Sequence, residues 1–126
     1  MNFDETLLAA FEAGRVDNAG FSHARHVQVA WMLSQRYCHE QAFEKLTAGI
    51  QRIAARAGRP QAFHLTMTRA WFELIAGADD PDHYPELLDK TLLSRYYSPE
   101  RLAAGRHAWL EPDLLPLCLP ADGRCH

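Results

Sequence analysis

The sequence contains no apolar run long enough to cross a bilayer and no cluster of basic residues. A membrane-spanning helix needs about 20 consecutive apolar residues, and no stretch of the chain approaches that length. The formal net charge is −3, and the Lys and Arg residues are scattered along the chain. It therefore lacks the electrostatic signature of a surface that binds nucleic acid. We expect neither a membrane nor a nucleic acid as a partner.

Cysteine is scarce, with three residues among 126. Cys38, Cys118 and Cys125 form an odd set without the spacing of a disulfide framework, so we expect free thiols. The N-terminal segment MNFDETLL is acidic, whereas a secretory signal begins with basic residues. These features predict a cytoplasmic protein.

Internal repeats, low-complexity segments and alternating strand patterns are also absent. The apolar fraction of 48% and the charged fraction of 23% are ordinary for a globular protein. A chain of this length suits one domain with one core. We therefore predict that residues 1–126 form a single all-α domain, a bundle of about five to six helices.

Apolar periodicity and capping residues locate these helices. We expect helices over residues 4–13, 23–37, 40–57, 61–76 and 85–93, and a short sixth helix that starts at residue 99. Gly14 and Gly58 suit the position after a helix end, and Ser22 and Ser98 suit the N-cap. The tail, residues 111–126, contains three prolines and is expected to be extended.

Seven histidines are a high count for this length, and three of them fall on predicted apolar faces. In the segment FSHARHVQVAW, at about 100° per residue, His23 and His26 point to the apolar side of the helix, and Met32 falls on the opposite side. In the segment AFHLTMT, His64 falls on the apolar side of the helix predicted over residues 61–76, and Thr66 falls on the opposite side.

Buried imidazoles must be hydrogen-bonded or coordinated, because an unsatisfied buried polar group costs about 1–3 kcal/mol. Side chains three residues apart on a helix are close enough for two imidazoles to reach one ion, and a packed helix can supply a third. We therefore predict a divalent transition-metal centre formed by His23, His26 and His64. Imidazole suits Cu, Zn and Fe.

Two other interpretations of these histidines stay open. They can form a polar core or a metal-free acid/base cluster, hydrogen-bonded to a carbonyl or to hydroxyls such as those of Ser34, Tyr37 and Thr68. They can also bind haem or another ligand. For a single buried histidine the polar core is the commoner outcome, whereas three on facing apolar stripes favour a metal.

A metal held by neutral histidines is a Lewis acid that polarises a bound substrate. We therefore expect a small metal-dependent enzyme acting on a small, anionic metabolite, with no catalytic side chain assigned. Arg95 and Arg106 are candidates to bind its carboxylate, and Trp31, Trp71 and Thr68 are candidates to line the site. The alternative is a non-enzymatic helical module for a ligand or protein partner. A homodimer is compatible with either.

The segments FSHARHVQVAW, AFHLTMT, LSRYYSPERL and RHAWLEPDLLPL resemble a family of small, uncharacterised bacterial helical proteins. Its motifs are F-x-H-x-x-H-V-x-x-A-W, aromatic-H-x-T-x-T and W-x-x-P-D-L-x-P-L, and the resemblance covers most of residues 11–117. The matching site positions are His23, His26, His64, Thr66, Thr68, Trp109, Pro112 and Asp113. Many members carry Glu after the histidine of the second motif, where this chain has Leu65. The resemblance implies a helical fold and the position of a site, and no reaction.

Overall fold

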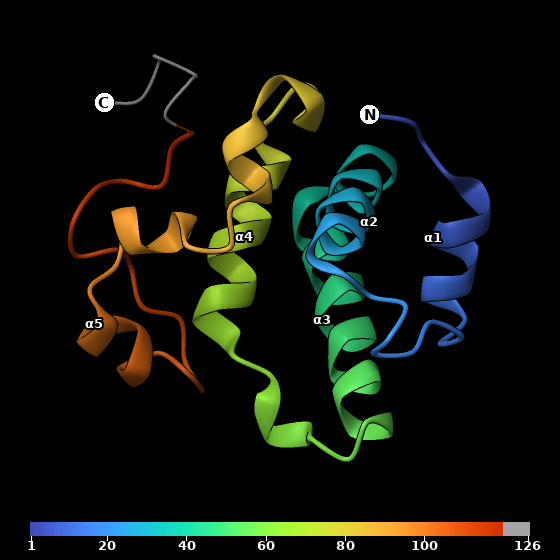
Figure 1. Cartoon of the computed structure of the whole chain (residues 1–126), viewed down its shortest axis with the longest axis horizontal. Helices are drawn as coiled ribbons and strands as arrows, with labels where there is room; N and C mark the ends of the chain where they lie inside the picture. Colours follow the sequence, from blue (N-terminus) through green and yellow to red (C-terminus); the bar gives the residue numbers. More distant parts are fainter. Residues whose placement is uncertain (120–126) are drawn as a thin grey trace. The chain divides into compact units, whose positions relative to one another are not determined.

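The computed structural model describes residues 1–119, so Cys125 lies outside the described residues. Within this range the chain is all-α, as predicted, with no strand. Its α-helices are α1 (Glu5–Glu12), α2 (His23–Arg36), α3 (His39–Arg56), α4 (Leu65–Ala76) and α5 (Pro99–Ala104) (Figure 1). None of the described helices is long and apolar enough to span a membrane. Internal contacts divide the chain into two compact units, one ending at Phe63 and one beginning at His64.

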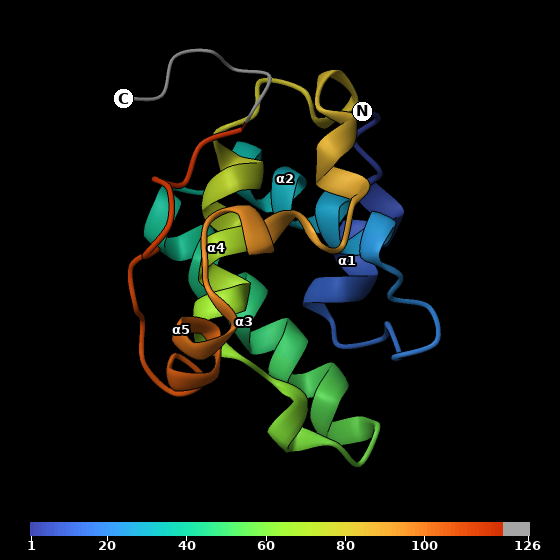
Figure 2. The ribbon, with the colours of Figure 1, turned by 60° about the vertical axis from the view of Figure 1, so that its left-hand side comes forward.

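In the first unit, α2 contacts both α1 and α3 (Figures 1 and 2). Only Tyr37 and Cys38 connect α2 to α3, so these two helices pack as a pair. The Oγ of Ser22 accepts the backbone N–H of Arg25 at 3.3 Å, which confirms Ser22 as the N-cap of α2. His23 is therefore the first residue of the helix.

The two glycines predicted at helix ends, Gly14 and Gly58, both have left-handed backbones with φ of 73°. After each glycine, the N–H of the next residue donates to a carbonyl five residues earlier, as Arg59 does to Ala54 at 2.8 Å. These bonds satisfy carbonyls that the end of a helix leaves unpaired. The prediction of glycine just after the end of α1 and of α3 is confirmed.

A glycine inside α3 lets α1 approach closely. Gly49 is buried, and a Cβ atom added there would overlap the ring of Phe11. The Phe11 ring stacks in turn on Phe21, with ring centroids 5.5 Å apart and an interplanar angle of 20°. This aromatic pair extends the packing of α1 and α3 to the residue before the N-cap of α2.

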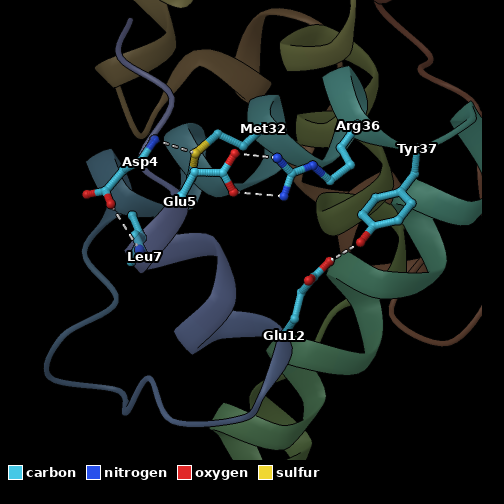
Figure 3. Close-up of polar contacts among 7 residues, drawn as sticks. All are labelled: Asp4, Glu5, Leu7, Glu12, Met32, Arg36 and Tyr37. Atoms are coloured by element: carbon cyan, nitrogen blue, oxygen red, sulfur yellow. Dashed lines mark hydrogen bonds and ion pairs between the residues drawn. The ribbon is translucent and has the colours of Figure 1, made fainter.

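Polar contacts also join α1 to the end of α2 (Figure 3). Two guanidinium nitrogens of Arg36 pair with the carboxylate of Glu5, and the hydroxyl of Tyr37 donates to Glu12 at 2.7 Å. The Arg36 guanidinium lowers the pKa of the Glu5 carboxyl. Because Arg36 and Glu5 are exposed, we expect this pair to fix orientation more than to add stability.

Met32 departs from the helical-wheel prediction. Its side chain is fully buried, whereas the wheel places it on the solvent side of α2. The backbone N–H of Asp4, the N-cap of α1, donates to the Met32 sulfur at 3.1 Å (Figure 3). The prediction is wrong because α1 covers this side of α2, and a wheel of one helix cannot show its neighbours.

The helix predicted over residues 61–76 starts too early. Pro60–Ala62 form a separate 3-10 turn, η1, and Phe63 is extended. His64 is the N-cap of α4, because its ring accepts the backbone N–H of Met67 at 3.1 Å. A histidine ring takes here the capping role more usual for Ser, Thr, Asp or Asn, so none of the usual N-cap residues marks this helix start.

The prediction of an α-helix over residues 85–93 is wrong. Two 3-10 turns, η3 (Pro85–Leu88) and η4 (Leu92–Arg95), take its place. Between the two turns, the Asp89 carboxylate accepts hydrogen bonds from the N–H of Thr91 at 2.9 Å and from the hydroxyl of Thr91 at 2.7 Å. Local side-chain bonds of this kind offer the backbone an alternative to the helix.

Ser98 caps α5, as predicted, and also anchors the tail. Its hydroxyl accepts the N–H of Arg101 at 3.2 Å. The same hydroxyl and the Ser98 N–H both donate to the Asp113 carboxylate, at 2.6 and 2.8 Å. Residues 111–119 contain no helix, in agreement with the prediction for the described part of the tail.

The cysteine prediction is only partly right. Cys38 is a free, exposed thiol before α3. Cys118 is disulfide-bonded, so the prediction of free thiols is wrong for this residue. An odd number of cysteines requires only that at least one of them lacks an intramolecular partner, which Cys38 satisfies.

Candidate functional site

His23 and His26 lie one turn apart at the start of α2, and their rings are neighbours, as the spacing predicts. The ring centroids are 6.0 Å apart and the ring planes meet at 75°. The ring of Phe21 lies 5.7 Å from that of His26. Phe21 directly precedes the N-cap and His26 is the fourth helical residue, so the two form the contact known as the hydrophobic staple.

The Nε2 atom of His26 is buried and has no hydrogen-bond partner within residues 1–119. Burial, and to a smaller extent the charge of His23, lowers the pKa of His26 to about 4. The ring is therefore neutral at pH 7. Leaving a buried polar atom unpaired costs about 1–3 kcal/mol, so a ligand on Nε2 would stabilise the first unit.

His64 is buried, and both of its ring nitrogens bond to the backbone of the second unit. Nε2 lies 2.7 Å from the carbonyl oxygen of Leu102, to which it donates, and Nδ1 accepts the N–H of Met67 at 3.1 Å. Since a carbonyl only accepts, this pair of bonds selects the neutral ring protonated on Nε2. This arrangement leaves His64 no unshared lone pair for a metal.

The first three N–H groups of α4 have no acceptor within the helix, and each of them has one outside it. The N–H of Leu65 donates to the Arg106 carbonyl at 2.9 Å, and that of Thr66 to the Gly105 carbonyl at 3.2 Å. The third N–H, of Met67, donates to the His64 ring. We call this set of bonds, with those of the His64 and Thr66 side chains, the α4 cap network.

Thr66 completes the α4 cap network. Its hydroxyl donates to the Ala108 carbonyl at 2.8 Å and accepts the Leu110 N–H at 3.1 Å. The side chain is fully buried, so the wheel prediction that placed it on the exposed face is wrong. The segment after α5 covers this side of α4, and a Cβ atom on Gly105 would overlap Thr66.

The two tryptophans predicted to line a substrate site lie in different units. Trp31, in α2, is partly exposed, and its ring centroid lies 6.4 Å from that of Phe3. Its buried indole Nε1 has no hydrogen-bond partner among residues 1–119. Trp71, in α4, is buried. A role in substrate binding stays a prediction for both.

The other predicted substrate-binding residues all lie in the second unit. Thr68 is buried, and its hydroxyl donates to the His64 carbonyl at 2.7 Å within its own helix. Arg95 and Arg106 are exposed, the first at the end of η4 and the second after α5. Their recognition of a carboxylate stays a prediction.

In the part of the chain that the structure describes, no group of three or more His, Cys, Asp and Glu side chains is arranged to hold a metal ion. Of the three predicted ligands, His23 and His26 are neighbours within the first unit. Sequence reasoning missed the partners of His64 and Thr66, because backbone carbonyls about 40 residues away leave no residue-type signal. It also missed Phe21 as a neighbour of the pair, although its place before an N-cap is such a signal.

Comparison with known proteins adds no relative. No protein-family model, curated protein or solved structure matches this chain.

Proposed function

We propose that the protein binds a divalent transition metal through His23 and His26. The observation that carries the proposal is the buried, unpartnered Nε2 of His26 beside a second imidazole. A buried polar atom that has no partner in a native protein requires an explanation, and a metal ion bound to that atom would provide it. Imidazole is a preferred ligand of Zn, Cu and Fe.

The separation of the two rings supports the proposal. Metal–nitrogen bonds of about 2.0–2.1 Å bring the centroids of two imidazoles on one ion to roughly 4.5–5.5 Å from each other at the usual coordination angles of about 90–120°. The observed 6.0 Å is slightly longer than that range. Small side-chain rotations would bring both rings onto one ion, and the i, i+3 helical spacing holds them side by side.

Two histidines leave further coordination positions to water or to a small-molecule ligand, as in open rather than structural sites. A metal bound there would supply Lewis acidity. We assign His64 to the fold and not to this centre, because both of its nitrogens are already hydrogen-bonded. This proposal keeps two of the three predicted ligands and takes the polar-core interpretation for the third.

Titration of tag-free protein with Zn²⁺, Cu²⁺ and Co²⁺ at pH 7 tests the proposal, using calorimetry and the visible spectrum of Co²⁺. We expect binding of one ion per chain. Both His23→Gln and His26→Gln should weaken it at least tenfold. His107→Gln, which removes an exposed imidazole of the second unit, is the matched control and should leave affinity unchanged.

His64→Asn separates the two-histidine centre from the three-histidine centre that the sequence predicts. Asn is a good N-cap, so this variant keeps the cap of α4 and removes the imidazole. If His64 serves only the fold, metal affinity stays that of the wild type. A large loss of affinity would restore His64 as a ligand, and equal binding by wild type and the His23→Gln, His26→Gln double variant would refute the centre altogether.

A further inference from the structure

A cavity of about 270 Å³ lies in the first unit, beside the C-terminal half of α3. Most of its lining is apolar and includes Phe21, Ile50, Ile53 and Phe63. Ile53 is buried, whereas Ala57, Arg59 and Ala62, which also line the cavity, are exposed, so the cavity opens to solvent. A concave apolar site with a few polar groups is the usual form of a small-molecule site.

Among residues 1–119, Arg59 is the one charged residue that lines the cavity. It has no acidic partner among residues 1–119, in contrast to Arg36, which pairs with Glu5. The two arginines of α3 donate to backbone carbonyls in α1 and just after it, Arg52 to Glu12 and Arg56 to Gly14. The charge of Arg59 is therefore available to an anion.

The backbone on both sides of Arg59 is held in a defined conformation. Gly58, with φ of 73°, ends α3 in the left-handed conformation, and the Arg59 N–H then donates to the Ala54 carbonyl at 2.8 Å. Pro60 follows at once and starts η1. A guanidinium carried on such a constrained segment loses less backbone freedom on binding than one on an open loop.

We propose that this cavity binds a small carboxylic acid with an apolar body, the carboxylate on Arg59 and the body against Ile50, Ile53 and Phe21. Arginine binds a carboxylate through two parallel N–H donors, and the other lining side chains offer mainly apolar contact. At about 30 Å³ for each water in the liquid, the cavity corresponds to roughly nine water molecules. Hexanoate, with eight non-hydrogen atoms, is of that size. This site does not depend on the proposed metal centre.

The experiment uses hexanoate as the probe, with hexan-1-ol and hexylamine as neutral and cationic analogues. Binding to the full chain is followed by the chemical shifts of backbone amides and by calorimetry. We expect hexanoate to bind about tenfold more tightly than hexan-1-ol, because it adds charge-assisted hydrogen bonds, and hexylamine to bind least. The shifts should centre on Ile50, Ile53 and Phe63.

Three variants locate the site. Arg59→Gln should weaken hexanoate binding about tenfold and leave hexan-1-ol binding unchanged. Arg25→Gln removes another exposed cation of the first unit, one that does not line the cavity, and should change neither affinity. Ala57→Leu places a larger side chain in the lining at an exposed position and should block both ligands.

Equal affinity for hexanoate and hexan-1-ol, equal losses in Arg59→Gln and Arg25→Gln, or shifts that avoid the cavity would each overturn the proposal. So would the lack of any binding. If Ala57→Leu fails to fold, Arg59→Gln still decides, because the side chain that it changes is exposed and makes no ion pair within the described residues.

Discussion

The Nε2–H of His64 donates to the carbonyl oxygen of Leu102 at 2.7 Å and joins residues 38 positions apart in the sequence. The other ring nitrogen caps the helix that His64 precedes. One imidazole thus pairs a helix N-terminus with the carbonyl end of a second helix, and it does so as a neutral donor and acceptor. His64 therefore has a structural role within the second unit.

We predict that His64→Ala destabilises the protein by about 2–3 kcal/mol, since it removes an N-cap worth about 1 kcal/mol and leaves the Leu102 carbonyl without its partner. His64→Asn should cost less, because Asn restores the cap. Urea unfolding followed by circular dichroism measures both values. If the Ala and Asn variants were equally stable, the capping bond to Met67 would contribute nothing.

Thr66→Val should destabilise the protein by about 2 kcal/mol. Val has nearly the same shape, but the change leaves the Ala108 carbonyl and the Leu110 N–H without their side-chain partner. Thr47→Val is the matched control, because the Thr47 hydroxyl is buried and unpartnered within residues 1–119. We expect that variant to be neutral or slightly more stable in the same urea titration. The opposite order of the two variants would contradict the network.

The stability of the metal-free protein should fall as the pH drops below 6.5, partly through His26. In the unfolded chain this ring takes up a proton near pH 6.5, whereas in the folded chain, where its pKa is about 4, it stays neutral until much lower pH. The unfolded state therefore binds more protons between these values. Linkage predicts a loss of about 2 kcal/mol from pH 7 to pH 5 from this residue alone.

His26→Leu isolates that contribution, because carboxyl groups and other histidines titrate alike in both proteins. Between pH 7 and pH 5 the free energy of unfolding of the variant should fall by about 2 kcal/mol less than that of the wild type. Parallel pH profiles for the two proteins would mean that the His26 ring is as well hydrated in the folded state as in the unfolded state.

Gly49→Ala should destabilise the protein by about 1–3 kcal/mol, the usual cost of overpacking a core. The change would be favourable in an isolated helix, by about 1 kcal/mol, so a loss of stability here reports the contact with Phe11. Combining it with Phe11→Leu should recover part of the loss. A double-mutant cycle that showed no coupling between the two positions would contradict the close packing of α1 on α3.

Local signals predict most of the helices. Ser22 and Ser98 cap the helices that they were expected to cap, and Gly14 and Gly58 follow the helix ends with positive φ. Such features depend on residue type within a few positions, which makes them readable from sequence. The bounds of the first three helices follow to within one residue at each end.

The predictions of helices and of buried faces are wrong where a side chain or a distant segment overrides the local apolar pattern. Asp89 holds Thr91 in a turn within the apolar run that predicted a fifth helix. The helical wheel places Met32 and Thr66 on the solvent side because it shows one helix at a time, whereas residues far away in the sequence cover both side chains. These are tertiary effects that override local preference.

In the candidate site, too, features set by local spacing could be predicted, and features set by distant segments could not. The three-residue spacing predicts correctly that His23 and His26 are neighbours, because helix geometry alone determines it. The place of His64 depends on carbonyls near α5, which no pattern of residue types reveals. The cavity beside Arg59 also depends on how the loop after α3 returns to that helix, so it could not be predicted.

The α4 cap network has a consequence for recognising relatives. Its two halves that residue type determines are the short string H-x-T at residues 64–66 and Gly105, neither of which is distinctive alone, whereas Ala108 and Leu110 contribute only backbone atoms. Because Thr66 fills the space that a Cβ on Gly105 would need, the string and the glycine form one signature with a variable insert. A profile that scores both halves together, with the insert length free, should separate chains with this architecture from other small helical proteins.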